Sequence, residues 1–285
     1  MANSASLTPA MHAYYELGKE AGRLGERGPG RLEFERTQEI VLRALPPAPA
    51  VVADIGGGPG RYALWLAELG YHVKHRDLMP LHVEQVTAAA AAMAAAGASG
   101  AAGGGRVESA VGDARTLDLA DGSADAVLLL GPLYHLDRAD RVRTLREAGR
   151  VVRPGGPVFG AAITRWAARL DGVLTQRLYE TEPDMEQMVA EVERTGVLQP
   201  LGPGSFCGFT HRPEELCAEA HEAGLQVADL VCVEGAAIML ADLTERAADP
   251  EAWRIVLDSA RALERVPELM GIGPHLLVTA LRPAG

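Results

Sequence analysis

A run of glycines directly follows an acidic residue, Asp54, near the start of this chain. Residues 51–61 read Val-Val-Ala-Asp-Ile-Gly-Gly-Gly-Pro-Gly-Arg. The short, β-branched run before the glycines predicts a buried strand, and the apolar residues after them predict a helix that ends at Gly70. Glycine lets a backbone adopt conformations that other residues avoid and lets it approach a ligand closely. A strand that enters a helix through glycines is typical of a nucleotide-binding loop.

The spacing of these glycines argues against two common nucleotide sites. Arg61 stands where the dinucleotide fingerprint G-x-G-x-x-G has its third glycine, and the chain has no Gly-Lys-Ser/Thr of a P-loop. The loop resembles instead the first motif of the class I S-adenosylmethionine-dependent methyltransferases, (D/E)-x-G-x-G-x-G. The residues that match this motif are Asp54, Gly56, Gly58 and Gly60.

Four further segments follow at the spacing of that family. Asp77 ends a predicted strand over 71–76, about 20 residues beyond Asp54, where an acid meets ribose hydroxyls. Asp113 follows a third strand over 106–111, and Gly131 follows a fourth over 126–130. An Arg-Pro-Gly-Gly turn at 153–156 precedes a fifth strand over 158–164. The resemblance therefore covers residues 51–164 and extends to predicted strands over 225–233 and 275–281.

The resemblance implies a fold, a cofactor and a set of cofactor-binding residues. The fold is a Rossmann-like α/β sheet of seven mostly parallel strands with an antiparallel last strand. The cofactor is S-adenosylmethionine, which leaves as S-adenosylhomocysteine. An acid at the position of Asp113 faces the adenine amine, and Arg23 would pair with the donor carboxylate. The residues expected to bind the cofactor are Asp54, Gly56, Gly57, Gly58, Gly60, Asp77, Leu78, Asp113, Ala114, Gly131 and Arg23.

The chain divides into four predicted parts. Residues 1–45 form an N-terminal lid helix over 11–24, a hinge over 25–31 and a helix over 32–45. Residues 46–164 form the cofactor-binding core. Residues 165–212 form a helical cap over an apolar acceptor, with Met185, Met188, Val189 and Val192 on one stripe, and 201–210 as a loop. Residues 213–285 complete the core with helices over 213–223, 236–248 and 251–264.

Acceptor chemistry in this fold belongs to the loops after the strands, here Gly131-Pro-Leu-Tyr-His. DNA amino-methyltransferases carry Asn/Asp-Pro-Pro-Tyr/Phe at this place, and the differences argue against nucleobase methylation. Catechol-type enzymes bring metal-binding acids to this place. This chain has no acid here before Asp137, so we expect no metal. Imidazole titrates near neutrality, so His135 is a candidate general base; the alternative is that it only positions the loop. Tyr15 and Glu16, on the lid helix, are the other candidate catalytic groups.

The composition argues against some classes of binding partner and indicates a cellular compartment. The 285 residues are 48% hydrophobic and carry a net charge of −11, which disfavours nucleic acid and membrane surfaces. Three cysteines without a CxxC pair argue against disulfides and zinc and indicate a reducing cytoplasm. The N-terminus has no basic start or apolar core typical of a signal peptide. We therefore expect a cytoplasmic protein, and a homo-oligomer stays open because the lid and cap could pack against a second subunit.

These observations predict transfer of a methyl group to a small, fairly apolar metabolite. An aromatic or heteroaromatic intermediate of secondary metabolism fits the acidic surface and apolar cap. The sequence leaves N-, O- and C-methylation open, including carbon methylation of an indole. Two alternatives remain: a nicotinamide-dependent oxidoreductase, and a catalytically silent binding or assembly protein that kept the fold.

Overall fold

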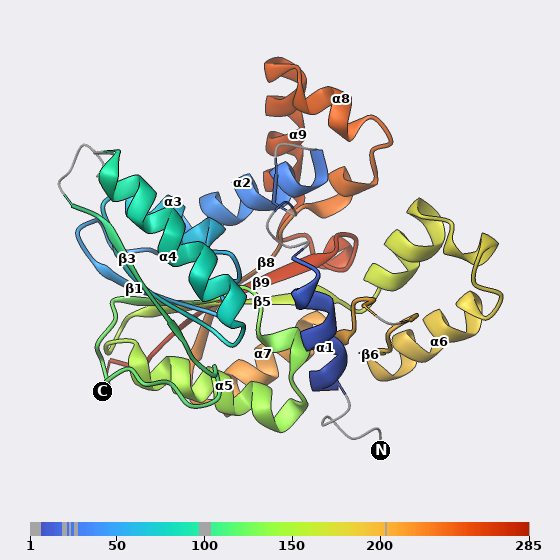
Figure 1. Cartoon of the computed structure of the whole chain (residues 1–285). Coiled ribbons are helices and arrows are strands. Elements are labelled where there is room, and N and C mark those ends of the chain that lie inside the picture. Colours follow the sequence, from blue (N-terminus) through green and yellow to red (C-terminus); the bar gives the residue numbers. More distant parts are fainter. Residues whose placement is uncertain are drawn as a thin grey trace.

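The structure is a computed structural model that describes residues 7–18, 22, 24–25, 28–96, 104–202 and 204–284. Its centre is a twisted sheet with helices on both faces (Figure 1). Among the described residues, no helix is both long and apolar enough to cross a membrane.

Seven of the nine strands of the described sheet lie side by side in the order β3-β2-β1-β4-β5-β9-β8. All run parallel except β9, which is antiparallel to both β5 and β8. This arrangement confirms the predicted fold class. The strand bounds are β1 Val51–Ile55, β2 His72–Asp77, β3 Arg106–Val111, β4 Ala126–Leu129, β5 Pro157–Thr164, β8 Gln226–Cys232 and β9 His275–Leu281.

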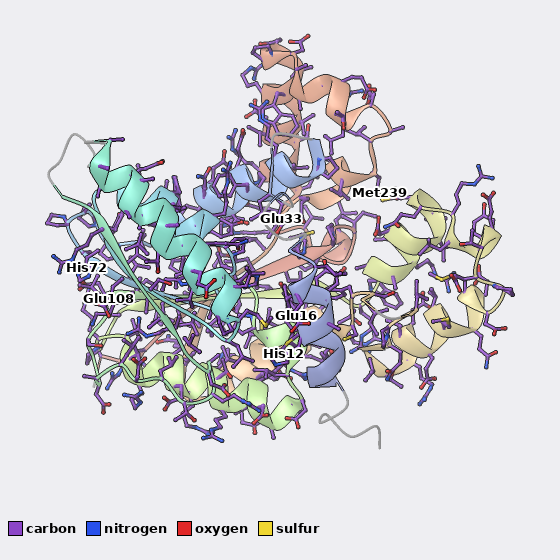
Figure 2. All side chains as sticks on the ribbon, viewed as in Figure 1. His12, Glu16, Glu33, His72, Glu108 and Met239 are labelled. Carbon is purple, nitrogen blue, oxygen red and sulfur yellow. The ribbon has the colours of Figure 1, made fainter. Side chains whose placement is uncertain are left out.

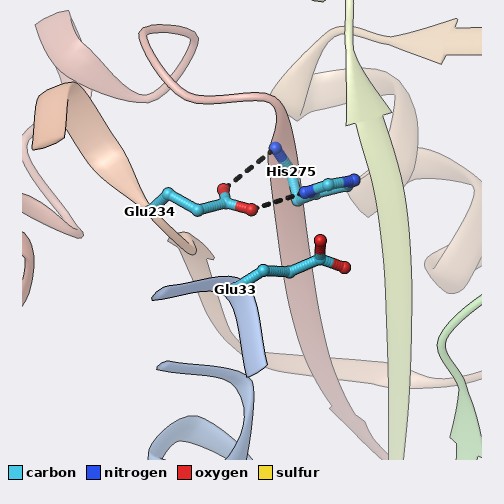
Figure 3. Close-up of side chains that lie close together, drawn as sticks. All are labelled: Glu33, Glu234 and His275. Carbon is cyan, nitrogen blue, oxygen red and sulfur yellow. Dashed lines mark hydrogen bonds and ion pairs between the residues drawn. The ribbon is translucent and has the colours of Figure 1, made fainter. Parts of the chain in front are cut away.

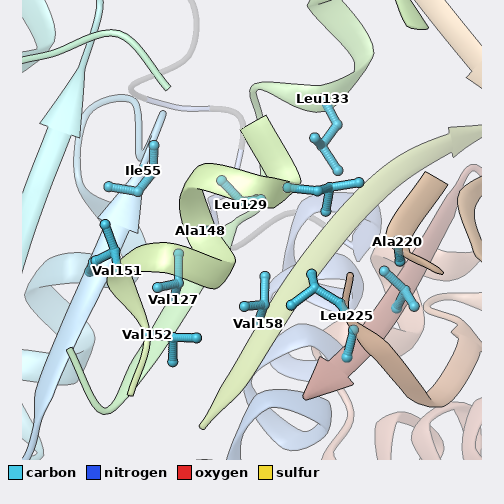
Figure 4. Packing of buried hydrophobic residues seen from close by; sticks show 14 of the residues in the cluster. Ile55, Val127, Leu129, Leu133, Ala148, Val151, Val152, Val158, Ala220 and Leu225 are labelled. Carbon is cyan, nitrogen blue, oxygen red and sulfur yellow. The ribbon is translucent and has the colours of Figure 1, made fainter. Parts of the chain in front are cut away.

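Alternate residues of each strand build two separate cores. On β4, Val127 and Leu129 face one side of the sheet, whereas Ala126 and Leu128 face the other. The first side packs against α5 (Arg138–Val151) and α7 (Pro213–Glu222), as Figure 4 shows for Ala148 and Ala220. Because neighbouring side chains of a strand point to opposite faces, these strands, buried on both sides, are apolar almost throughout.

The second face of the sheet is covered by the helices before and after β1. Contacts with this face come from α2 (Gly28–Leu42) and α3 (Arg61–Glu68), through Ile40 and Leu66 among others. Helix α4 (Pro80–Ala95) packs beside β2 and β3. Helices α8 (Leu243–Ala247) and α9 (Pro250–Leu263) pack beside α2 (Figure 1). Leu32 of α2 forms a small cluster there with Leu243 and Trp253.

Two helix predictions near the N-terminus need correction. Helix α1 spans Leu7–Glu16 instead of 11–24, because Gly18 adopts a φ of +66° and ends it. Helix α2 begins at Gly28, inside the predicted hinge. Proline is tolerated in the first turn of a helix, and Arg31 is held there by Glu35 at 2.6 Å. The predicted hinge is therefore partly helical.

The predicted helix over 236–248 is also wrong, because the chain breaks into two pieces. A 3₁₀ turn over Gly235–Met239 precedes α8. The turn between them lets both Leu240 and Leu243 pack with Leu32 of α2. Apolar spacing alone does not distinguish this arrangement from one continuous helix.

The inserted segment after β5 has its own small core. It contains a π-helical turn (Ala168–Thr175), α6 (Met185–Thr195) and a hairpin of β6 (Val197–Leu198) with β7 (Gly208–His211). Met185 and Val189 pack against Val173 within the segment, so this part of the predicted stripe belongs to the core of the segment. Strand β7, which lies in the predicted loop, pairs with the end of β5 beyond the point where β4 stops.

Candidate cofactor and acceptor site

A cavity of about 460 Å³ lies at the carboxyl ends of β1, β2, β3 and β4. Its walls come from the loops that follow these strands, from the first turns of α3 and α4, and from α1. Helix α1 lies across this edge of the sheet (Figure 1). The loop residues among its walls include Gly56, Gly57, Gly58, Asp77, Leu78, Asp113, Ala114 and Gly131. The parallel sheet thus gathers most of the predicted cofactor residues around one space.

The glycine loop leaves one position open toward a ligand. Gly58 has a φ of +57°, and a Cβ there would meet nothing within 4 Å. Its amide donates to Oδ2 of Asp77 at 2.8 Å, and its carbonyl accepts from Nε2 of His75 at 3.0 Å. The second nitrogen of His75 lies 2.9 Å from the Ser109 hydroxyl, so the loop is braced from β2 and β3. The backbone at Gly58 is therefore held in place beside free space.

Asp54 lies beneath this loop and does not line the cavity. A Cβ on Gly57 would lie 2.4 Å from Oδ2 of Asp54, which shows how closely the loop covers the carboxyl group. Both carboxyl oxygens are buried without a hydrogen-bond partner in the described structure. Burial, together with the nearby charge of Asp77, raises the pKa of Asp54 to about 7. A cationic group bound above the loop would favour its charged form.

Asp77 already accepts three hydrogen bonds. Besides Gly58, the donors are the Met79 amide at 2.8 Å and Nδ1 of His82 at 3.0 Å. Burial opposes ionisation, but His82 and the backbone amides outweigh it and lower the pKa of Asp77. A carboxylate has about four acceptor positions, so capacity for a hydroxyl donor remains on Asp77.

Asp113 is half-exposed and is held by Arg115. The guanidinium group contacts Asp113 at 2.7 Å and Asp140, on α5, at 2.9 Å. The Arg115 side chain is the main reason that the pKa of Asp113 is lowered. Ala114, between Asp113 and Arg115 in sequence, also lines the cavity. The adenine end of the predicted site therefore has one ionised carboxylate, that of Asp113, in its wall.

The loop after β4 turns sharply at Gly131 and enters a 3₁₀ turn, Leu133–His135. A Cβ on Gly131 would lie 2.9 Å from the carbonyl oxygen of Gly56, so the two loops touch through backbone. The turn buries Leu133 in the core and brings His135 to the cavity wall. This close approach requires glycine at position 131.

His135 and Tyr15, two of the predicted catalytic residues, are in contact. The Tyr15 hydroxyl lies 2.7 Å from Nε2 of His135, and the Tyr15 ring also meets His82 edge to face at 5.5 Å. Burial lowers the pKa of His135 to about 4, with the Cys207 backbone and Asp77 opposing this only in part. The imidazole is therefore neutral at pH 7 and accepts the phenolic proton as a hydrogen bond.

Besides Asp54, three predicted residues are not among the described residues that line the cavity, and Gly60 is one of them. Glu16 is exposed on α1 near His12, and it is not among the residues that line the cavity (Figure 2). Arg23 falls outside the described residues. The inserted segment contacts α1 through Phe206, whose ring lies 5.6 Å from the ring of Tyr14 and 5.5 Å from that of His135.

Sequence reasoning missed the polar face of α4. His82, Gln85 and Ala89 line the cavity together, at the i, i+3, i+7 spacing of one helix face. Nε2 of His82 and Oε1 of Gln85 are buried and have no hydrogen-bond partner within the described chain. A signal for His82 was present in the sequence. It follows Asp77 by only five positions, at the junction of a strand with a helix.

One group of potential metal ligands lies outside the cavity. Glu33 of α2, Glu234 and His275 bring one ligand atom each to within 4.8 Å of one another (Figure 3). Glu234 is buried and accepts from Nδ1 of His275 at 2.5 Å. This contact is explained by a carboxylate–imidazole pair. The expectation that the protein uses no metal stays a prediction.

Comparisons with known proteins agree with this geometry. A family model described as a methyltransferase domain matches residues 53–160. A ubiquinone biosynthesis O-methyltransferase of Xanthomonas axonopodis is 30% identical over 67% of this chain and 69% of its own length. An uncharacterized methyltransferase of Mycobacterium bovis is 32% identical over 41% of this chain, and the match spans 42% of that relative.

A solved structure extends the likeness to the fold. A SAM-dependent methyltransferase from Methanosarcina mazei aligns with a TM-score of 0.57 and 18% identity, covering 86% of this chain and 98% of its own. A likeness at this level of identity supports the same overall fold. The chain belongs to the class I S-adenosylmethionine-dependent methyltransferase family.

Proposed function

We propose that this protein transfers the methyl group of S-adenosylmethionine to a small, fairly apolar aromatic or heteroaromatic metabolite, such as an intermediate of natural-product biosynthesis. The observation that carries the proposal is that one cavity has a polar wall suited to the cofactor and an apolar wall suited to the acceptor. The glycine loop, Asp77 and Asp113 line one part, whereas Met11, Tyr15 and other α1 and α3 side chains line another. Cofactor and acceptor can therefore share this space.

The cofactor residues of this proposal fit the chemistry of the ligand. Asp113 can only accept, which suits the adenine amine, and the remaining acceptor capacity of Asp77 suits a ribose hydroxyl. The open side of Gly58 leaves room for the ligand next to the backbone. When bound, the cofactor supplies a methyl group that is already activated, because it leaves a neutral thioether behind. Arg23 as a partner of the donor carboxylate remains part of the proposal.

The acceptor part of the proposal rests on the remaining wall. Apolar surface comes from Met11, Leu24, Tyr62 and Leu64, which favours an apolar ring. Orienting two reactants in a closed site can supply about 7–11 kcal/mol, so few catalytic side chains are needed. In this proposal His135 positions Tyr15, since its low pKa makes it a weak base. The Xanthomonas relative is named an O-methyltransferase, which favours oxygen as the acceptor atom.

Two measurements on the full chain test this function. Calorimetric titration with S-adenosylhomocysteine should show one-site binding, and NADH should not bind. Incubation with S-adenosylmethionine and a panel that includes p-cresol, 4-methylcatechol and indole should release S-adenosylhomocysteine with at least one acceptor. Donor binding without transfer to any member of a broad panel would favour the silent binding protein. Binding of NADH alone would favour an oxidoreductase.

A further inference from the structure

His82 has one ring nitrogen fixed by a carboxylate and the other without a partner. It lies in the first turn of α4, and its Nδ1 is 3.0 Å from Oδ1 of Asp77. Its Nε2 is buried and makes no hydrogen bond to any described residue. The side chain is 2% exposed and forms part of the cavity wall.

This arrangement selects one tautomer of His82. Asp77 also accepts from the amides of Gly58 and Met79, and these donors favour its charged form. A carboxylate can only accept, so the imidazole proton must be on Nδ1. Nε2 of His82 then carries a lone pair. A carboxylate that orients an imidazole in this way also stabilises the imidazolium that forms when Nε2 takes a proton.

The ring of Tyr15 lies between His82 and His135. The centroid distances are 5.5 Å to His82 and 5.4 Å to His135, both edge to face. Nε2 of His135 is engaged by the Tyr15 hydroxyl, whereas Nε2 of His82 has no donor. Of the two histidines, His82 has both the available lone pair and the anionic partner.

We propose that His82 is the proton acceptor of this site and that the substrate presents an O–H or N–H group to it. The inference rests on the proposed function and deepens it. The proton leaves the acceptor oxygen or nitrogen and joins Nε2 of His82. The electron pair of that O–H or N–H bond stays on the acceptor atom, which forms its new bond to the methyl carbon. The electrons of the broken carbon–sulfur bond remain on sulfur.

Gln85 supports the same substrate class. Its Oε1 is a second buried acceptor without a partner in the described structure, one helical turn beyond His82 on the same face of α4. Buried acceptors without donors are costly, so a ligand that brings hydrogen-bond donors satisfies both. The α4 wall therefore favours a hydroxylated or amino-substituted ring over a purely hydrocarbon one.

His82 lies near several charged and titratable groups. Asp77 lies at the end of β2, with Asp54 below it on β1 and His75 on the same strand. Tyr15 approaches from α1, and His135 lies beyond it on the turn after β4. Only Asp77 contacts the His82 ring by a hydrogen bond among these groups. Asp77 is therefore the group that fixes the orientation of the His82 ring.

Histidine-ring NMR of the ¹⁵N-labelled full chain bound to S-adenosylhomocysteine tests the arrangement directly. The His82 signals, assigned by their loss in His82→Asn, should show a protonated Nδ1 and a bare Nε2 at neutral pH. Adding p-cresol should shift these signals, whereas 4-methylanisole, which has no O–H, should not. A proton on Nε2 at neutral pH, or equal responses to both compounds, would overturn the proposal.

Turnover provides a second readout. In His82→Asn the amide N–H can still donate to Asp77, so affinity for S-adenosylhomocysteine should stay within about threefold, because the lost group is the base and not the donor. Turnover of p-cresol should fall about 10²–10⁴-fold, as expected for loss of a general base. His221→Asn makes the same change at an exposed site on α7 and should behave as wild type.

The outcomes separate the two proposals. If the wild-type protein binds no S-adenosylhomocysteine and methylates no acceptor, the proposed function fails, and the role of His82 fails with it. If the wild-type protein methylates p-cresol and His82→Asn does so equally well, only the role of His82 is wrong. If turnover falls and affinity for S-adenosylhomocysteine falls equally, His82 acts through Asp77 on the cofactor site, and the proton-acceptor role is overturned.

Discussion

The hydroxyl of Tyr15 lies 2.7 Å from Nε2 of His135, although the two residues are 120 positions apart in sequence. This hydrogen bond joins α1 to the turn after β4 and closes α1 over the cavity. The Phe206 ring packs against both Tyr14 and His135, so the inserted segment also contacts α1 here. Helix α1, the turn after β4 and the inserted segment therefore meet at His135.

Tyr15→Phe should loosen α1 without removing the ring contacts. A neutral hydrogen bond contributes about 0.5–1.5 kcal/mol, so hydrogen exchange of the α1 amides should rise by up to about tenfold. Tyr179→Phe removes a hydroxyl from an exposed ring in the inserted segment and should leave α1 unchanged. Equal exchange of α1 in wild type and Tyr15→Phe would show that the hydrogen bond does not hold the lid.

Gly58→Ala should block the cofactor more than it destabilises the fold. A left-handed conformation costs an alanine about 1–2 kcal/mol, and the new methyl group would extend into free space at the loop. Gly155→Ala is a matched control, because Gly155 also has a positive φ, +75°, with nothing within 4 Å of a Cβ. Urea unfolding should show a similar loss in the free energy of unfolding for both variants. Only Gly58→Ala should weaken S-adenosylhomocysteine binding, by about tenfold or more, because its methyl group clashes with the ligand.

Asp113→Ala tests the adenine end of the site. The ion pair with Arg115 is partly exposed, so its loss should change the free energy of unfolding by less than about 1 kcal/mol. Binding of S-adenosylhomocysteine should weaken about tenfold or more, because a hydrogen bond to a charged group is lost. Asp140→Ala also takes a carboxylate from Arg115, but outside the cavity. A similar loss of affinity in both variants would assign the effect to Arg115.

Asp54→Asn should change how stability depends on pH. The pKa of Asp54 is raised from 3.8 to about 7 in the folded protein, so the folded state binds this proton more tightly than the unfolded state. Stability therefore falls as the pH rises from about 4 to 7, by at most about 4 kcal/mol at 1.36 kcal/mol per pKa unit. Asparagine cannot titrate, so the variant should lose this decline.

Urea unfolding at pH 5 and pH 8 measures the difference. Comparison of the two proteins at each pH cancels other groups, including His135, whose lowered pKa makes stability rise with pH between about 4 and 6.5. Parallel pH dependence in wild type and Asp54→Asn would mean that Asp54 is not buried without donors. Bound S-adenosylhomocysteine should reduce the difference if its cationic amino group lies near the loop.

The sequence by itself determined the strands of the sheet and where the predicted cofactor residues lie along it. Gly58, Asp77 and Asp113 each follow a strand of the core, and parallel strands bring their carboxyl ends to one edge. Strand β9 begins and ends at the predicted residues, because it is one short apolar run that is buried on both faces of the sheet. Local pattern was sufficient wherever the chemistry lies within a few residues of a strand end.

Only the tertiary structure decided which side chains meet. The contact of Tyr15 with His135 and the open Nε2 of His82 depend on how α1, α4 and the turn after β4 pack, which no local spacing encodes. The place of Met185 and Val189 in the core of the inserted segment likewise follows from packing against Val173. Residue periodicity shows that a helix has an apolar face, but the partner of that face is set by the fold around it.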